Sequence, residues 1–149
     1  MIIVTGAAGF IGSNLVAGLN ETGRDDIVLV DRLGSDGKWR NIARRRFLDF
    51  VFPEDLDSRL ASLPRADAVF HMGGISSTTA ADADEIVRTN FQLSTRLWDW
   101  CARSGTPFVY ASSAATYGNG AAGFDDLESP DHLAKLQPLN LYGWSKHAF

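Results

Sequence analysis

A short apolar segment at the start of the chain runs directly into three regularly spaced glycines, and this feature constrains the fold most strongly. Met1 to Thr5 has the composition of a buried strand, and Gly6, Gly9 and Gly12 follow it at the spacing G-x-x-G-x-x-G. The next segment, Phe10 to Glu21, has the apolar period of a helix. Glycines let the backbone turn sharply, and a helix N-terminus supplies N–H groups and the positive end of a dipole. The three segments together predict a binding loop for a pyrophosphate.

Apolar runs bounded by turn residues alternate with amphipathic segments along the rest of the chain. Further strands are expected at Ile27–Val30, Phe47–Phe50, Ala66–Phe70 and Pro107–Ala111, and helices at Asp55–Leu63, Ala83–Ser104 and from Tyr142 onward. Loops are expected at Leu33–Asn41 and Gly118–Leu139, and the first helix should turn one face to the core with Ile11, Leu15, Val16 and Leu19. This alternation predicts an α/β fold of the Rossmann type, a doubly wound parallel sheet with right-handed crossovers. The length of 149 residues fits one domain.

An acidic residue closes the second expected strand, at the position that reads the adenosine ribose in dinucleotide sites. Asp31 lies about 20 residues beyond the glycine loop and would accept hydrogen bonds from the ribose hydroxyls. Arg32 and Lys38 are cations that would favour a 2′-phosphate. Asp49, expected just after the third strand, would accept from the adenine amino group. These residues leave both NAD and NADP open.

Three side chains near the fifth strand and the last helix match an acid–base site. Tyr142 and Lys146 lie four residues apart, so a helix places them one turn apart on one face. Ser113 follows the fifth strand, at the carboxyl edge of the sheet where ligands bind in open α/β folds. A neighbouring ammonium favours the phenolate form of a tyrosine, which then accepts or returns the proton of a substrate hydroxyl. Ser113 would hold the same oxygen, and Lys146 would also bind the nicotinamide ribose.

The motifs resemble those of the extended short-chain dehydrogenase/reductase family of nucleotide-sugar epimerases and dehydratases. The resemblance is carried by T-G-A-A-G-F-I-G from Thr5, A-S-S-A-A-T-Y-G from Ala111 and L-Y-G-W-S-K from Leu141. The opening segment to Asn14, S-S-T-T from Ser76 and P-L-N-L-Y-G-W-S-K from Pro138 narrow it to the branch that acts on ADP-heptose. UDP-glucose 4-epimerases share the serine, tyrosine and lysine and remain the alternative.

The resemblance implies an epimerase of lipopolysaccharide core biosynthesis. Its substrate would be an ADP-heptose or another sugar nucleotide, oxidised transiently at C6 beside a bound NADP, with NAD as the alternative cofactor. The family assigns further contacts to residues of this chain. The cofactor-binding residues expected on this basis are Gly6, Gly9, Phe10, Ile11, Gly12, Asp31, Arg32, Lys38, Asp49, Phe50, Met72, Gly73, Gly74, Ile75, Ser76, Asn90, Tyr142 and Lys146.

Two positions depart from the family pattern. Met72 stands where the family often has an acid after the strand-four histidine, and Pro53 lies where a lysine is usual after the third strand. Both departures weaken the case for NADP, but Arg32 and Lys38 keep it ahead of NAD.

The resemblance also implies that the chain stops before the substrate domain, so that the isolated 149 residues are expected to be inactive. A complete enzyme would be a homo-oligomer. Two other classes of function remain: a net oxidoreductase or dehydratase on the same scaffold, and a regulator that binds NADP without catalysis. The intact Ser113, Tyr142 and Lys146 argue against the regulator.

Composition excludes several classes of site and partner. The net charge of −4 and the pI near 5.2 argue against a nucleic-acid partner. No apolar run reaches the roughly 18 residues of a membrane helix, and no signal-peptide pattern or metal-ligand spacing is present. The single cysteine, Cys101, fits a reducing cytoplasm and is expected to be buried. His71 is expected to be a packed residue at a strand end, and the run Arg44–Arg46 a solvated edge.

Overall fold

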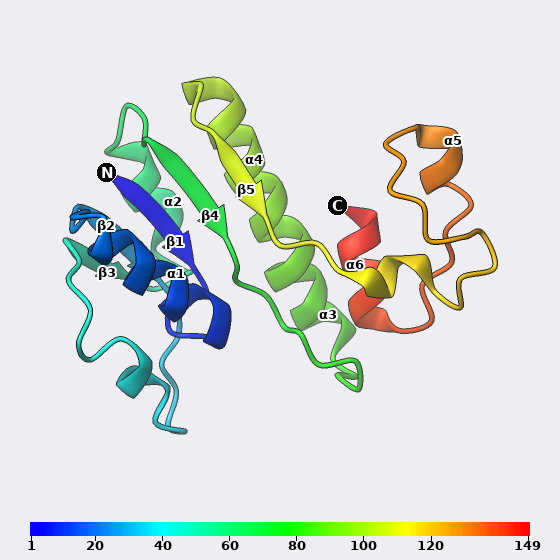
Figure 1. Cartoon of the computed structure of the whole chain (residues 1–149), viewed down its shortest axis with the longest axis horizontal. Helices are drawn as coiled ribbons and strands as arrows, with labels where there is room; N and C mark the ends of the chain where they lie inside the picture. Colours follow the sequence, from blue (N-terminus) through cyan, green and yellow to red (C-terminus); the bar gives the residue numbers. More distant parts are fainter. The chain divides into compact units, whose positions relative to one another are not determined.

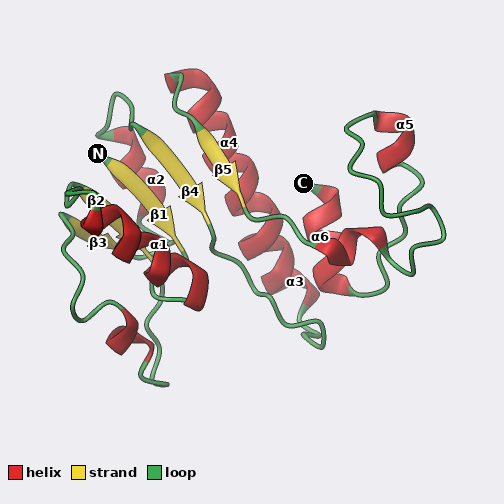
Figure 2. Ribbon diagram, viewed as in Figure 1, coloured by secondary structure: helices red, strands yellow, loops and turns green.

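The computed structural model describes residues 1–149, which form two compact units. Unit 1 comprises Met1–Gly73 and Arg96–Ala111, and unit 2 comprises Gly74–Thr95 and Ser112–Phe149. All strands belong to unit 1, whereas unit 2 consists of helices and loops (Figure 2).

Unit 1 is built on a parallel sheet of five strands. In chain order they are β1 (Ile2–Thr5), β2 (Ile27–Val30), β3 (Asp49–Val51), β4 (Ala68–His71) and β5 (Phe108–Tyr110). Their order across the sheet is β3-β2-β1-β4-β5, with every neighbouring pair parallel (Figure 1). The chain therefore reverses direction across the sheet between β1 and β4, which is where dinucleotide-binding folds place their ligand. The predicted α/β fold with a Rossmann-type sheet is confirmed.

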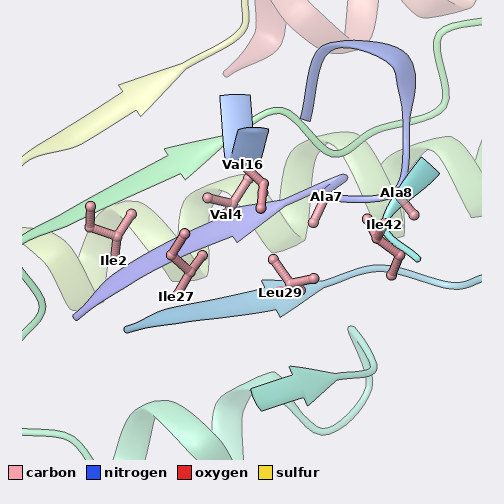
Figure 3. Close-up of a cluster of buried hydrophobic side chains, with 8 residues drawn as sticks. All are labelled: Ile2, Val4, Ala7, Ala8, Val16, Ile27, Leu29 and Ile42. Carbon is pink, nitrogen blue, oxygen red and sulfur yellow. The ribbon is translucent and has the colours of Figure 1, made fainter. Parts of the chain in front are cut away.

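Burial on both faces explains why the central strands are continuous apolar runs. Every residue of β1 and β2 is buried, as expected for parallel strands that helices cover on both sides. On one face α1 (Phe10–Glu21) packs through Val16 against Val4 and Leu29 (Figure 3). On the other face lie α2 (Leu56–Ala61) and the unit 1 part of α4 (Leu93–Ser104) (Figure 1).

Two contacts join the helices of the second face. The indole N–H of Trp100 donates to the carbonyl oxygen of Leu60 at 3.2 Å, and Arg96 pairs with Asp57 at 3.2 Å. Cys101 on the same helix is buried, as predicted, and burial raises the pKa of its thiol to about 11. The thiol therefore stays protonated at neutral pH and serves as a small apolar packing group.

Unit 1 also contains the 3₁₀ turn η1 (Lys38–Asn41), and unit 2 contains the remaining helices. These are α3 (Ala83–Ile86), the π-helical turn η2 (Val87–Gln92), the first turn of α4, the 3₁₀ turn η3 (Ala114–Tyr117), α5 (Pro130–Leu133) and α6 (Leu141–Ala148). The helix predicted over Ala83–Ser104 has the expected extent, but a π-helical turn interrupts it. No helix of the chain is long and apolar enough to cross a bilayer.

Four sequence-based expectations about local structure were wrong. The loop predicted over Leu33–Asn41 contains η1. The third strand begins at Asp49, two residues later than predicted, because the side chains of Phe47 and Leu48 are exposed rather than packed. The loop predicted over Gly118–Leu139 contains α5, which begins with Ser129 as its N-cap. Ile11 does not face the core with the other apolar residues of α1, since its side chain is 61% exposed.

Candidate active site

The glycine loop of unit 1 is as tight as its sequence predicts. Gly6 has a φ of +63°, and a Cβ atom placed there would lie 2.7 Å from the Cα atom of Gly73. A Cβ atom on Gly12 would collide with the carbonyl oxygen of Gly6. Both positions therefore require glycine, because any side chain would force the loop away from the strand end it packs against.

The start of α1 has the features of an anion-binding helix end. Gly9 is the N-cap and offers no side-chain cap, so the first backbone N–H groups of α1 have no partner within the helix. Phe10 and Ile11 stand on this first turn with exposed fractions of 86% and 61%. The N–H donors suit the pyrophosphate of a dinucleotide, and the exposed apolar pair suits its flat rings.

Asp31 is held at the end of β2 by the glycine loop itself. Its Oδ2 atom accepts a hydrogen bond from the backbone N–H of Ala8 at 2.8 Å, and its Oδ1 atom accepts one from the ammonium of Lys38 at 2.6 Å. The carboxylate is 6% exposed. A buried carboxylate needs such donors, so the predicted ribose acceptor is fixed in place beside a cation.

The second predicted cation, Arg32, is paired with an acid that the sequence did not point to. The Nε atom of Arg32 lies 3.1 Å from Oε1 of Glu54, and both side chains are more than half exposed. A backbone hydrogen bond and this pair lower the pKa of Glu54. A phosphate near the ribose end of the site would therefore compete with Glu54 for Arg32.

A surface cavity of about 340 Å³ opens over the loop that follows Asp31. It is lined by Gly34, Ser35, Asp36, Gly37, Trp39 and Arg40. The guanidinium of Arg40 sits 5.1 Å from the centre of the Trp39 ring, a favourable cation–π distance. The flat, half-exposed indole is the feature of this loop best suited to stacking on a base.

Asp49 does not occupy the position that the sequence predicted. It begins β3 instead of following it, level with Val28 in the middle of β2. Its carboxylate pairs with Arg59 at 3.1 Å and accepts from the backbone N–H of Phe50 at 2.9 Å. Because the carboxyl edge of a parallel sheet holds the ligand, this placement gives no support to an adenine contact by Asp49 or by the adjacent Phe50.

The end of β4 is tied to the end of β1. Thr5 Oγ1 lies 2.6 Å from Nδ1 of His71 and accepts from the backbone N–H of Gly73 at 3.0 Å. His71 is fully buried and stacks on Tyr110, which confirms that it is a packed strand-end residue. Met72 and Gly73 are thereby held against the glycine loop, where a dinucleotide-lining role was predicted.

In unit 2, Asn90 braces the next residues of this segment. Its Oδ1 atom accepts from the backbone N–H of Ile75 at 2.7 Å, and its Nδ2 atom donates to the Ile75 carbonyl oxygen at 2.9 Å. Asn90 is fully buried, whereas Gly74 and Ser76 are exposed. Asn90, expected among the cofactor-binding residues, therefore braces this segment through its side chain.

The three predicted catalytic residues all belong to unit 2. Ser113 is the N-cap of η3, where its hydroxyl oxygen accepts from the N–H of Ala115 at 3.1 Å and its own proton remains available to a substrate. Tyr142 and Lys146 lie one turn apart on α6, which Asn140 caps by accepting from Gly143 N at 2.8 Å.

Close packing brings α6 against the turn that carries Ser113. A Cβ atom on Gly143 would lie 2.7 Å from the carbonyl oxygen of Ala115, so only glycine fits there. Gly143 stands directly after Tyr142. This role was not predicted from the sequence, since a helical glycine alone does not reveal what it packs against.

The amine of Lys146 is buried, and this changes its acid–base behaviour. The side chain is 7% exposed, and desolvation lowers the pKa of the amine from 10.5 to about 8. Burial disfavours the charged ammonium. The pKa thus falls close to neutral pH, as is common for a lysine at an active site.

Comparisons with known proteins agree with this arrangement. The model of the NAD dependent epimerase/dehydratase family matches residues 2–149. ADP-L-glycero-D-manno-heptose-6-epimerase of Fusobacterium nucleatum is 48% identical over all of this chain and 46% of its own length. The enzyme of the same description from Alkalilimnicola ehrlichii is 44% identical over the same shares. The chain thus spans about half the length of the curated relatives it matches.

Solved structures show the same likeness. ADP-L-glycero-D-manno-heptose-6-epimerase of Helicobacter pylori superposes with a TM-score of 0.78 and 30% identity, over 99% of this chain and 48% of that one. UDP-glucuronic acid 4-epimerase of Bacillus cereus, solved in complex with NAD, gives 0.76 and 27% identity over 97% and 48%.

Proposed function

Since this chain belongs to the NAD dependent epimerase/dehydratase family, we propose that it forms the dinucleotide-binding part of an ADP-L-glycero-D-manno-heptose 6-epimerase. The observation that carries the catalytic half of this proposal is the geometry of unit 2. Tyr142 and a buried Lys146 share one helix, which packs through Gly143 on the turn that Ser113 caps. The relatives at 44–48% identity support the heptose substrate.

The cofactor proposed for this site is NADP. In unit 1, the N–H groups at the start of α1 would hold the pyrophosphate, and Asp31 with Lys38 the adenosine ribose. Gly6 and Gly12 fit this role, because a Cβ atom at either would fill the tight loop. Lys38 and Arg32 support a 2′-phosphate, which needs cations. Tighter binding of NAD⁺ than NADP⁺ in a fluorescence titration would overturn this choice.

When bound, the dinucleotide would accept the hydride and return it, and the residues of this chain would transfer the proton. Tyr142 would take the proton from the sugar hydroxyl during oxidation and return it when the carbonyl is reduced. Ser113 would donate a hydrogen bond to the same oxygen, which holds the reacting carbon in place. Lys146, one turn from Tyr142 on α6, would bind the nicotinamide ribose.

Three properties of the whole enzyme are part of this proposal. It would act in the cytoplasm, in keeping with the buried reduced Cys101. It would assemble as a homo-oligomer, for which Trp98, 52% exposed on α4, is a candidate contact residue. The 149 residues alone would turn over no sugar, and detectable epimerisation by them would overturn that expectation.

Substrate conversion by the protein in its natural full length tests the proposed function. The protein is incubated with ADP-D-glycero-manno-heptose, the stereochemistry at C6 is followed by NMR, and reduced nicotinamide is followed by absorbance. Conversion to the L-glycero epimer at constant absorbance is expected. Conversion of a UDP-hexose instead would reassign the substrate, and a steady change in absorbance would indicate a net oxidoreductase.

A further inference from the structure

A buried chain of hydrogen bonds in unit 2 ends on the backbone of Tyr142 and is not explained by any role described above. Asn90 Nδ2 donates to the hydroxyl of Ser145 at 2.9 Å, and that hydroxyl donates to the carbonyl oxygen of Tyr142 at 2.7 Å. Asn90 and Ser145 are both completely buried. Ser145 therefore links a residue 55 positions earlier in the sequence to the first turn of α6.

The direction of each hydrogen bond in this chain is fixed. A serine hydroxyl has one proton, and the carbonyl oxygen of Tyr142 can only accept it, so Asn90 must be the donor to Ser145. The Asn90 amide oxygen then faces the N–H of Ile75, as the distance of 2.7 Å between them requires. Each side-chain donor and acceptor atom of Asn90 thus has a partner, and the amide cannot be flipped without loss of all three bonds.

Asn90 lies in a π-helical turn, and from there its side chain reaches both Ile75 and Ser145 on α6. Such turns are rare and occur often at functional sites. The wide turn Val87–Gln92 contains Asn90, and the hydroxyl of Ser94 donates to its carbonyl oxygen at 2.6 Å. Asn90 is therefore fixed through its backbone as well as through its side chain.

The Asn90 end of this chain of hydrogen bonds lies beside the amine of Lys146. A Cβ atom on Gly74 would lie 3.1 Å from Oδ1 of Asn90 and 3.6 Å from Nζ of Lys146. The backbone at Gly74 thus runs close to both side chains. A shift of α6 along its axis would change the distance between Lys146 and this strand-end segment, and Ser145 is the group that opposes such a shift.

We propose that Ser145 is a positioning residue, which holds the Tyr142–Lys146 helix in register with the segment Gly74–Ile75 through Asn90. The inference rests on the proposed function, because it assigns Ser145 an effect on turnover. Ser145 itself would touch neither the sugar nor the dinucleotide. Its effect passes through Asn90 and the backbone of Tyr142.

Replacement of Ser145 by alanine tests the inference, with Thr95→Ala as the control. Each change removes a hydroxyl that donates to a backbone carbonyl of its own helix, but the Thr95 hydroxyl bonds to Phe91, whereas the Ser145 hydroxyl joins Asn90 to Tyr142. In the full-length protein, we expect Ser145→Ala to lower kcat about 10- to 100-fold at unchanged KM, as for a loss of orientation. Thr95→Ala should leave kcat close to that of the unaltered protein. Equal effects of the two changes, or none, would overturn the proposal.

A double substitution tests the route through Asn90. If Ser145 acts through Asn90, then Ser145→Ala should lower kcat by less than about twofold in an Asn90→Ala background. A full additional loss in the double variant would show that the two residues act independently and would contradict the inference.

Amide hydrogen exchange separates this inference from the proposed function, because it needs no substrate. Ser145→Ala should speed exchange in α6 at least about tenfold while exchange in the sheet of unit 1 is unchanged. Unaltered exchange in α6 would refute the positioning role even if the protein is an epimerase. Faster exchange in a protein that converts no sugar would support the positioning role and refute only the proposed activity. A Ser145→Cys variant, closer in volume, serves if the alanine variant does not fold.

Discussion

Replacement of Lys146 by methionine should make the ligand-free protein more stable while it removes activity. Methionine keeps a long unbranched chain at the buried site but carries no charge. The folded protein lowers the pKa of this amine from 10.5 to about 8, so it disfavours the ammonium that the unfolded chain carries freely. The native state is thus destabilised by the buried amine of Lys146.

The size of the effect follows from the two pKa values. A tenfold change in an equilibrium corresponds to about 1.4 kcal/mol, so the difference between 10.5 and about 8 amounts to roughly 3 kcal/mol. Lys146 also takes part in a further interaction, and whatever methionine does not reproduce of it reduces the gain. The expected net gain in the free energy of unfolding is therefore about 1–3 kcal/mol near pH 7.

The pH dependence of this stability difference gives a sharper test than its size at one pH. The unfolded chain binds the proton more tightly than the native state does, so the cost to the native state is complete below pH 8. It fades as the pH rises from about 8 toward 10.5, because the native state has then released the proton and the unfolded chain begins to release its own. The stability of Lys146→Met relative to the unaltered protein should therefore fall by about 2–3 kcal/mol between pH 7 and pH 10.

Urea unfolding followed by circular dichroism, at several pH values between 7 and 10, measures this difference. Lys135→Met is the control, because Lys135 is exposed and its removal should change little at any pH. A methionine variant less stable than the unaltered protein near pH 7, or a difference that does not shrink with rising pH, would refute the argument from burial.

Three further substitutions test packing and cofactor choice. Gly143→Ala should lower the free energy of unfolding, because overpacking against the Ala115 carbonyl oxygen costs about 1–3 kcal/mol and exceeds the helix-propensity gain. Gly18→Ala, where a Cβ atom meets nothing within 4 Å, should instead stabilise α1 by about 0.5–1 kcal/mol, and thermal melts decide between these signs. Glu54→Gln should remove one competitor for Arg32 and raise the preference for NADP⁺ over NAD⁺ up to about fivefold in fluorescence titrations. An unchanged ratio of the two dissociation constants would show that Arg32 has no part in the choice.

The elements of unit 1 were predictable because their patterns are local. The helix Phe10–Glu21 and the strand Ile27–Val30 occur with the predicted bounds. The third strand was misplaced because the apolar run Phe47–Leu48 is exposed at the sheet edge, and a single sequence does not reveal which side of a run is covered. The short α5 had a readable signal that was not used, a serine N-cap followed by Pro130.

The site was predictable where spacing alone determines geometry. Tyr142 and Lys146 share a helical face for that reason, and the glycines of the first loop are needed for close packing. The partners from distant parts of the chain were not predictable. The pairing of Arg32 with Glu54 and the contact of Asn90 with Ser145 depend on tertiary structure, which no local pattern encodes.

Replacement of Tyr142 by phenylalanine in the full-length protein tests the central claim most directly. The claim is that this hydroxyl transfers the proton of the sugar during epimerisation, while the bond network of unit 2 keeps its helix in place. We predict that the variant folds, binds the dinucleotide as before, and converts ADP-heptose at least about a hundredfold more slowly. Conversion at an undiminished rate by the phenylalanine variant would contradict the account.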